Sequence, residues 1–362
     1  MDHLNLLKKK VKGVENRFGS LAVHFSDFCQ LKCSFCELPE CKEILSPEIL
    51  KKAKRGNPLN FVVVGGGEPT NAPKNLFKEL ITSLGNTKSK LITNGVSFPD
   101  VLCRIKNPFY HVRISLDAGN KSSYKKLKGL DVFDQVMSNI EKYLSIDAKI
   151  VCIDFVITED NILEIPEIIL LVFNKFFINY PEKIYIQFKL LVSYFSFDLN
   201  VPKEENVKSA LSEIKKISES DLWINYFIKT HTNFDIIKYS FFNYNQRIQL
   251  TDKCYASQVV NILGTGGEVF SCPDHIYKKE APLGNLKKDK LSTIFKNQFN
   301  FFNNFEPRKC ESCKNCSKKE LNAFLEKVLH SKYDIAPSNI GMLSAFDTLD
   351  YFYTKKNLDA LK

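Results

Sequence analysis

The sequence lacks any apolar run long enough to cross a membrane. A bilayer span needs roughly 20 consecutive apolar residues, whereas the longest clear apolar run in this chain of 362 residues covers only residues 168–173. The first residues, MDHLNLLKKKVKG, have no apolar stretch and no small-residue cleavage site of a secretory signal. We therefore expect a cytoplasmic protein that has no membrane partner.

Repeats, low-complexity segments and concentrated charge are also missing. The formal net charge is +10, and such a balance can indicate binding to nucleic acid. The lysines are scattered, however, with only short runs such as residues 8–10. A solvated, lysine-rich surface is the simpler interpretation, so we do not expect a nucleic-acid partner. No Ser–His–Asp or paired-carboxylate spacing stands out, and the catalytic residues stay unassigned.

Short β-branched and aromatic runs alternate with helical patterns through the first half of the chain. Repeated strand–helix alternation predicts an α/β fold with a parallel sheet and helices outside it. Periodicity alone does not separate a closed barrel from an open one. The predicted strands are residues 21–25, 61–64, 90–93, 111–116, 149–157 and 183–190.

Helix and turn signals refine this pattern. Ser46-Pro47-Glu48 predicts a helix start, with an N-cap followed by proline at the first helical position. The glycine-rich segment at residues 264–267, flanked by β-like runs, predicts a hairpin. Further helices are expected at residues 132–144, 163–176 and 202–220, and a β-like stretch is expected after residue 220.

Eleven cysteines are present, and in a reducing cytoplasm we do not expect structural disulfides. Eight of them fall into two groups whose spacing indicates metal or cluster ligation. Cys103 and Cys152 lie outside these groups and are expected to be small core residues. Cys41 also lies outside but close to the first group, and a functional role is not assigned to it.

The first group has the spacing C-x₃-C-x₂-C directly after a predicted strand, with Cys29, Cys33 and Cys36 as the thiols. A 4Fe–4S cube has four irons, so three thiolates leave one iron without a protein ligand. An open metal position lets a small molecule coordinate. Zinc is the alternative, but structural zinc usually takes two C-x₂-C pairs, and no second pair lies nearby.

This first group resembles the radical S-adenosylmethionine (SAM) superfamily, whose motif is C-x₃-C-x-aromatic-C with Phe35 at the aromatic position. Gly65-Gly66-Gly67-Glu68-Pro69 resembles the family's GGEP element, which contacts the methionine amino group of SAM. Glycines permit a close backbone approach, and Glu68 can accept hydrogen bonds from an ammonium group. The resemblance thus assigns Gly65, Gly66, Gly67 and Glu68 to SAM binding.

Two further segments extend the resemblance over residues 20–190, which implies a partial (β/α)₆ barrel. Asn94 lies in Thr93-Asn94-Gly95, which ends the third predicted strand as such segments often do in family members. The segment Arg113-Ile114-Ser115-Leu116-Asp117-Ala118 resembles the fourth-strand element, whose polar side chains reach the SAM ribose or carboxylate. Ser115 and Asp117 share a strand face. We expect Ser115 to face the cofactor, while Asp117 either contacts it or caps the next turn.

The second cysteine group resembles the SPASM/twitch type of C-terminal extension, which implies a small cysteine-rich α+β domain. Gly264 to Pro273 resembles its opening and Pro282-Leu283-Gly284-Asn285 its PLGN element. Five thiols suffice for one auxiliary cluster, expected to be 4Fe–4S, and one spare thiol among the last three cysteines. A Cys₄ zinc site is the alternative. The ligand candidates are Cys254, Cys272, Cys310, Cys313 and Cys316.

These resemblances divide the chain into five parts. The core barrel and the auxiliary domain are joined by a connecting segment and flanked by an N-terminal extension and a helical tail. We place them at residues 1–18 (extension), 19–200 (barrel), 201–250 (connection), 251–320 (auxiliary domain) and 321–362 (tail).

The implied activity is reductive cleavage of SAM at the first cluster. The resulting 5′-deoxyadenosyl radical would abstract hydrogen from a substrate, and the auxiliary cluster would relay electrons. A low-potential donor such as flavodoxin or ferredoxin would supply the electron. A non-catalytic iron–sulfur or zinc protein acting in binding or electron transfer is the alternative from another class. Asp274 and His275, beside Cys272, are expected in a turn or surface role rather than in catalysis.

Two substrate classes remain open: a peptide or protein side chain, and a sugar-like small molecule. Only about 18 residues precede the first predicted strand, too few for a precursor-peptide-binding domain, which weakens the peptide hypothesis. The ending Asp359-Ala360-Leu361-Lys362 lacks the terminal glycine pair of molybdopterin-type cyclases, which argues against that reaction.

Overall fold

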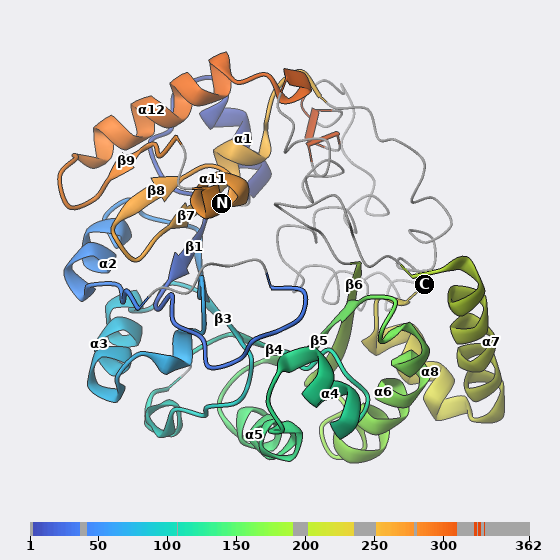
Figure 1. Ribbon diagram of the computed structural model, residues 1–362. Helices are drawn as coiled ribbons and strands as arrows, with labels where there is room; N and C mark the ends of the chain where they lie inside the picture. Colours follow the sequence, from blue (N-terminus) through green and yellow to red (C-terminus); the bar gives the residue numbers. More distant parts are fainter. Residues whose placement is uncertain are drawn as a thin grey trace. The chain divides into compact units, whose positions relative to one another are not determined.

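The computed structural model consists of two compact units (Figure 1). The terminal unit comprises Met1–Cys29, Leu38–Leu91 and Ile248–Lys362, and the central unit comprises Gln30–Glu37 and Ile92–Arg247. Cys41, Cys310, Cys313 and Cys316 lie outside the described residues, as does most of the expected tail. The structure describes residues 3–36, 42–106, 108–190, 202–234, 251–278, 281–309, 322, 323, 325, 326 and 329. None of the helices in these ranges combines the length and apolarity that a membrane span requires.

The terminal unit is built on the parallel strands β1 (Ser20–His24), β2 (Asn60–Val64) and β3 (Ser89–Thr93). β2 lies between the other two. The crossovers contain the helices α2 (Pro47–Lys54) and α3 (Lys74–Leu84). α2 begins where the sequence predicts, because the Ser46 hydroxyl accepts a hydrogen bond from the Glu48 amide at 3.3 Å.

The C-terminal part of the chain continues this sheet. After the short helix α10 (Ala256–Val259), β7 (Val260–Leu263) pairs in parallel with β1. β8 (Glu268–Phe270) then returns antiparallel, and β9 (Gly284–Asn285) pairs with β8. The predicted hairpin is therefore confirmed, and its first strand is bonded directly to the first strand of the chain.

Close packing at this junction requires Gly19. A Cβ at this position would lie 2.1 Å from the carbonyl oxygen of Val259. Around it, Leu7 packs with Tyr255 and Phe302 in a buried cluster that joins three helices. These are α1 (His3–Lys10), α10 and α12 (Leu291–Asn304). The remaining short helices of the unit are η1 (Pro69–Asn71), α11 (Pro273–Lys278) and η5 (Pro307–Lys309).

The central unit contains the parallel strands β4 (His111–Ser115), β5 (Ile150–Ile157) and β6 (Ile184–Leu190). All six strands predicted from the sequence are thus present. Ile114, Ile153 and Phe188 are buried, and strand alternation puts them on the opposite face from Ser115, Asp154 and Gln187. Figure 1 shows the helices of this unit lying along the strands. They are η2 (Asp100–Arg104), α4 (Lys121–Lys128), α5 (Phe133–Ser145), η3 (Ile162–Glu164), α6 (Ile165–Val172), the π-helix η4 (Phe173–Phe177), α7 (Glu204–Ser220) and α8 (Leu222–His231).

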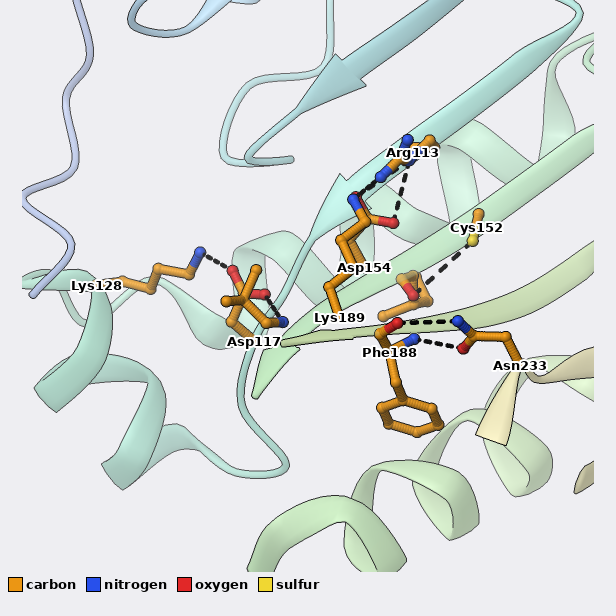
Figure 2. A network of polar contacts seen from close by, with 10 residues as sticks. Arg113, Asp117, Lys128, Cys152, Asp154, Phe188, Lys189 and Asn233 are labelled. Atoms are coloured by element: carbon orange, nitrogen blue, oxygen red, sulfur yellow. Dashed lines mark hydrogen bonds and ion pairs between the residues drawn. The ribbon is translucent and has the colours of Figure 1, made fainter. Parts of the chain in front are cut away.

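The β-like stretch expected after residue 220 does not begin there, because residues 222–231 form helix α8. The part of this expectation at residues 235–250 lies outside the described residues. A carboxylate oxygen of Asp221 accepts hydrogen bonds from the Trp223 and Ile224 amides at 2.7 and 3.1 Å, which caps the helix. Only beyond α8 does the chain become strand-like. There Thr232 bridges Ile186 in parallel, and the Asn233 side chain binds the Phe188 backbone (Figure 2).

The two isolated cysteines differ in their surroundings. Cys152 is buried on β5, as expected of a small core residue. Cys103 is exposed, so the same expectation is wrong for it. The reason is local: η2 buries Val101 and Leu102, and the next position points outward.

Lys10 is a buried lysine at the end of α1. Its ammonium donates to the carbonyl oxygen of Arg17 and to Oε1 of Gln298, both at 2.8 Å. Burial lowers the pKa of Lys10 to about 7, opposed by the charge of Glu15. The folded protein therefore releases this proton more readily than the unfolded chain does.

This shift predicts a specific pH dependence of stability. Between pH 7 and 10.5 the unfolded chain holds the Lys10 proton more tightly, so the free energy of unfolding rises with pH. We expect Lys10→Met to remove a slope on the order of 1 kcal/mol per pH unit, measured by urea unfolding across this range. The matched variant Lys9→Met, exposed on the same helix, should keep the wild-type slope. An unaltered slope in Lys10→Met would contradict the assignment.

Candidate functional site

The glycine-rich loop after β2 packs directly against the backbone that leads into Cys29. The Gly67 amide donates to the Ser26 carbonyl at 3.2 Å, and the Glu68 amide donates to the Phe28 carbonyl at 2.8 Å. A Cβ on Gly67 would lie 2.4 Å from the carbonyl carbon of Phe28. Glycine is therefore required, because any side chain would separate the two segments.

Glu68 is held in place before any ligand arrives. It is buried, and its Oε1 accepts hydrogen bonds from the Thr70 amide at 3.0 Å and the Thr70 hydroxyl at 2.6 Å. Such bonds fix the orientation of a carboxylate that is expected to receive an ammonium group. Sequence reasoning overlooked Thr70, although a threonine two residues after an acidic residue is a known local hydrogen-bonding arrangement.

Asp27 connects the same loop to the C-terminal hairpin. Its Oδ2 accepts a hydrogen bond from the Thr265 hydroxyl at 2.6 Å, and its Oδ1 lies 3.3 Å from Nδ1 of His24. A Cβ on Gly66 would lie 2.4 Å from this Oδ1. Burial alone would raise the pKa of Asp27, but the bonds from His24, Thr265 and the Gly66 amide hold it below its usual value. The turn of the hairpin is thereby fastened two residues before Cys29.

In the central unit, the end of α4 holds the segment that contains Cys33. The Lys32 amide donates to the Lys128 carbonyl at 3.1 Å, and the Ser34 amide donates to the Leu127 carbonyl at 2.8 Å. Helix C-termini carry carbonyls that lack partners within the helix, and here loop amides satisfy them. The Lys128 ammonium also lies 5.3 Å from the centre of the Phe35 ring.

Lys128 forms a buried ion pair with Asp117 (Figure 2). The other oxygen of Asp117 accepts a hydrogen bond from the Val156 amide at 2.6 Å. Asp117 therefore holds the fold together at the end of β4, whereas the side chain of Asn120 caps α4. Burial would lower the pKa of Lys128, but the charges of Asp117 and of the Cys33 thiolate raise it above its ordinary value.

The remaining predicted cofactor residues of the central unit lie near strand ends. Asn94 donates from Nδ2 to Oε1 of Gln30 at 3.3 Å, and Gln30 directly follows Cys29 in the chain. Ser115 is half-buried at the end of β4, in register with Asp154. The sequence did not predict that Asn94 binds Gln30 or that Ser115 lies beside Asp154. Pairing between distant segments leaves no periodic signal in a sequence.

Two candidates of the second group are described, and both belong to the terminal unit. Cys254 is half-buried beside the helical cluster, and Nδ2 of Asn322 lies 3.7 Å from its sulfur. Cys272 is half-buried just after β8. His275 follows it, and its ring packs edge-on against Phe301 and Phe305. His275 therefore lies in helix α11 rather than in the expected turn, and its packing gives it a structural role.

The donor set of the first group fits an iron–sulfur cluster. Cys29 and Cys33 are half-buried, and Cys36 is exposed. Among the described side chains, no three His, Cys, Asp or Glu residues gather around a single point. Thiolates are the usual ligands of iron–sulfur clusters, and the three thiols are accessible enough to bind one.

Comparison with known families agrees with this chemistry. The chain matches the radical SAM superfamily over residues 23–172 and an iron–sulfur cluster-binding domain, SPASM, over residues 254–317. These matches and the site define an iron–sulfur enzyme of the α/β class. The chain belongs to the radical SAM superfamily and carries a SPASM domain, so it binds SAM and iron–sulfur clusters.

Individual relatives are distant. A probable GTP 3′,8-cyclase of Saccharolobus solfataricus is 29% identical over 164 residues, which cover 40% of this chain and 51% of the relative. One from Sulfurisphaera tokodaii is 27% identical over 167 residues, covering 42% and 53%. The chain thus spans about half the length of the curated relatives it matches. The crystal structure of Streptococcus suis SuiB aligns with a TM-score of 0.58 at 17% identity, covering 90% of this chain and 77% of SuiB. That likeness establishes the fold.

The glycine requirement can be tested with a matched pair of variants. We expect Gly67→Ala to lower the rate of SAM cleavage about 100-fold, because its Cβ displaces the backbone before Cys29. Gly264→Ala is the control, since the nearest atom to its Cβ would be Oε2 of Glu268, at an ordinary contact distance of 3.5 Å. Formation of 5′-deoxyadenosine under anaerobic conditions measures both. Equal rates in the two variants would show that close packing at Gly67 is unimportant.

The buried pair predicts a large stability effect. Lys128→Met leaves the Asp117 carboxylate buried beside an apolar side chain, which should cost about 3–5 kcal/mol of unfolding free energy. Lys126→Met removes an exposed lysine of the same helix, paired with Asp160, and should cost less than about 1 kcal/mol. Urea unfolding of the anaerobic protein compares them. Similar losses in both variants would refute the importance of the Asp117 pair.

Proposed function

We propose that Cys29, Cys33 and Cys36 hold the 4Fe–4S cluster at which SAM is cleaved. When bound, this group supplies the electron that splits SAM, and the 5′-deoxyadenosyl radical takes a hydrogen atom from the substrate. The spacing of the three thiols supports the assignment, together with the backbone packing that fixes the chain before Cys29. Cys41 lies outside the described residues and has no part in the proposal.

The side chains around this loop have the roles of binding and orientation. Gly65, Gly66 and Gly67 let the backbone approach the amino acid end of SAM, and Glu68, oriented by Thr70, accepts its ammonium protons. Asn94 and Ser115 lie at strand ends, where polar groups can reach the ribose or the carboxylate. Phe35 packs under the Lys128 ammonium and orders the loop between Cys33 and Cys36.

A second, auxiliary 4Fe–4S cluster is proposed for Cys254 and Cys272 with two of Cys310, Cys313 and Cys316. It would relay electrons, because a cube with four thiolates has no vacancy for a substrate. A low-potential flavodoxin or ferredoxin is the proposed donor. The clusters need thiols that stay reduced, which favours the cytoplasm. The proposed boundaries are residues 19–200 for the barrel and 251–320 for the auxiliary domain.

A peptide or protein side chain is the proposed substrate class, with a sugar-like small molecule as the second. The observation that favours a peptide is the alignment of 90% of this chain with SuiB, which has been crystallised with its precursor peptide SuiA. The relatives described as GTP 3′,8-cyclases match only about 40% of the chain. Their similarity therefore supports radical SAM chemistry for this chain, but it says little about its substrate.

Cysteine variants test the cluster assignment. We expect Cys33→Ala to abolish formation of 5′-deoxyadenosine with SAM and dithionite, because the cube loses a ligand. Cys272→Ala should retain part of the cleavage, since it removes only an auxiliary ligand. Cys103→Ala, exposed and outside both groups, should behave as the wild type. Cleavage at the normal rate in Cys33→Ala would show that the assignment is wrong.

A further inference from the structure

The central sheet carries charged side chains on one face only. Arg113 of β4 binds the Asp154 carboxylate with Nε at 3.1 Å from both oxygens, and Lys189 of β6 donates to Oδ2 at 2.7 Å (Figure 2). Strand register places Ser115, Asp154 and Gln187 side by side on this face. The opposite face is apolar, so the side chains able to bind a charged ligand lie on the polar face.

Among the described residues, this network pairs two cations with one carboxylate. Asp154 is bound by Arg113 and Lys189, and its electrostatic surroundings also include the neutral pair of Asp117 and Lys128. Burial raises the pKa of Asp154 to about 6, opposed by the charge and the hydrogen bond of Arg113. Where two cations share one carboxylate, the more exposed cation can still donate to an external anion.

Exposure increases along the network toward the lysine. The side chain of Asp154 is 3% exposed, that of Arg113 is 12% exposed, and that of Lys189 is 35% exposed. The Asp154 carboxylate and the Arg113 guanidinium are therefore the buried part of the network. The Lys189 ammonium is its solvent-accessible part. Gln187, half-buried two residues earlier, lies on the same face.

We propose that Lys189, anchored by Asp154 and Arg113, binds an anionic group of the substrate, a carboxylate or a phosphate. This inference rests on the proposed function for the identity of the site, but the anion-binding property does not depend on SAM cleavage. An ammonium that already donates to a buried carboxylate is held in position. It can donate a further charge-assisted hydrogen bond to an incoming anion. The substrate would then be held by charge on β6.

The test measures anion binding to the anaerobic, reconstituted full-length protein by calorimetry with saturating SAM. Saturation fills the SAM carboxylate site, so a further anion must bind elsewhere. The probes are inorganic phosphate, for a phosphorylated small molecule, and N-acetyl-aspartate amide, for a peptide carboxylate. We expect one probe to bind the wild type, and Lys189→Met to weaken its binding at least about ten-fold. Lys189→Arg, which keeps the charge, should stay within about three-fold.

Lys203→Met is the matched control, because Lys203 is an exposed lysine of the same unit paired with Glu159. It should bind the probe as the wild type does. The proposal is overturned if neither anion binds the wild type, if Lys189→Met binds as tightly, or if SAM affinity falls in parallel with probe affinity, which would assign the charge to SAM. Absence of 5′-deoxyadenosine in the wild type would defeat the proposed function but leave the anion measurement valid.

Discussion

The close approach of two backbone segments, one leading into Cys29 and one through Gly67, is the constraint on which the candidate site depends. Hydrogen bonds from the Gly67 and Glu68 amides set the position of the chain just before the first thiol. Because only hydrogen fits at Gly67, the same contact also fixes where the Glu68 carboxylate lies. The segments proposed to hold the metal ligands and to bind SAM are thereby positioned by one interaction rather than by two independent loops.

Buried charge serves a related purpose in the central unit. A buried ion pair is weak evidence for stability, because desolvating both charges offsets their attraction. Lys128 nevertheless makes three separate contacts. Its ammonium pairs with the Asp117 carboxylate and lies over the Phe35 ring, and its main-chain carbonyl accepts a hydrogen bond from the Lys32 amide. An apolar residue could fill the same volume but could not orient the loop. We infer that this lysine specifies the loop conformation more than it stabilises the fold.

Much of the fold followed from local signals, and the misses have physical causes. Strands with β-branched alternation and the Ser46 cap were predicted because the information lies within a few residues. Residues 222–231 form a helix although the aromatic and β-branched residues after position 220 favoured a β-like stretch, because the Asp221 side chain caps the helix and Ile224 and Phe227 are buried on it. For the site, the cysteines and glycines have motif spacing, whereas Thr70 and Lys128 act through contacts that no spacing reveals.

The parallel pairing of β7 with β1 carries a consequence for electron transfer. Strand pairs are stiff, so Cys254 and Cys272, which flank β7 and β8, are tied to the strand that leads into Cys29. The hydrogen bond from Thr265 to Asp27 adds a second attachment between the same two parts of the terminal unit. For the proposed relay of electrons between clusters, this main-chain pairing and one side-chain bond would hold Cys254 and Cys272 at a fixed distance from Cys29.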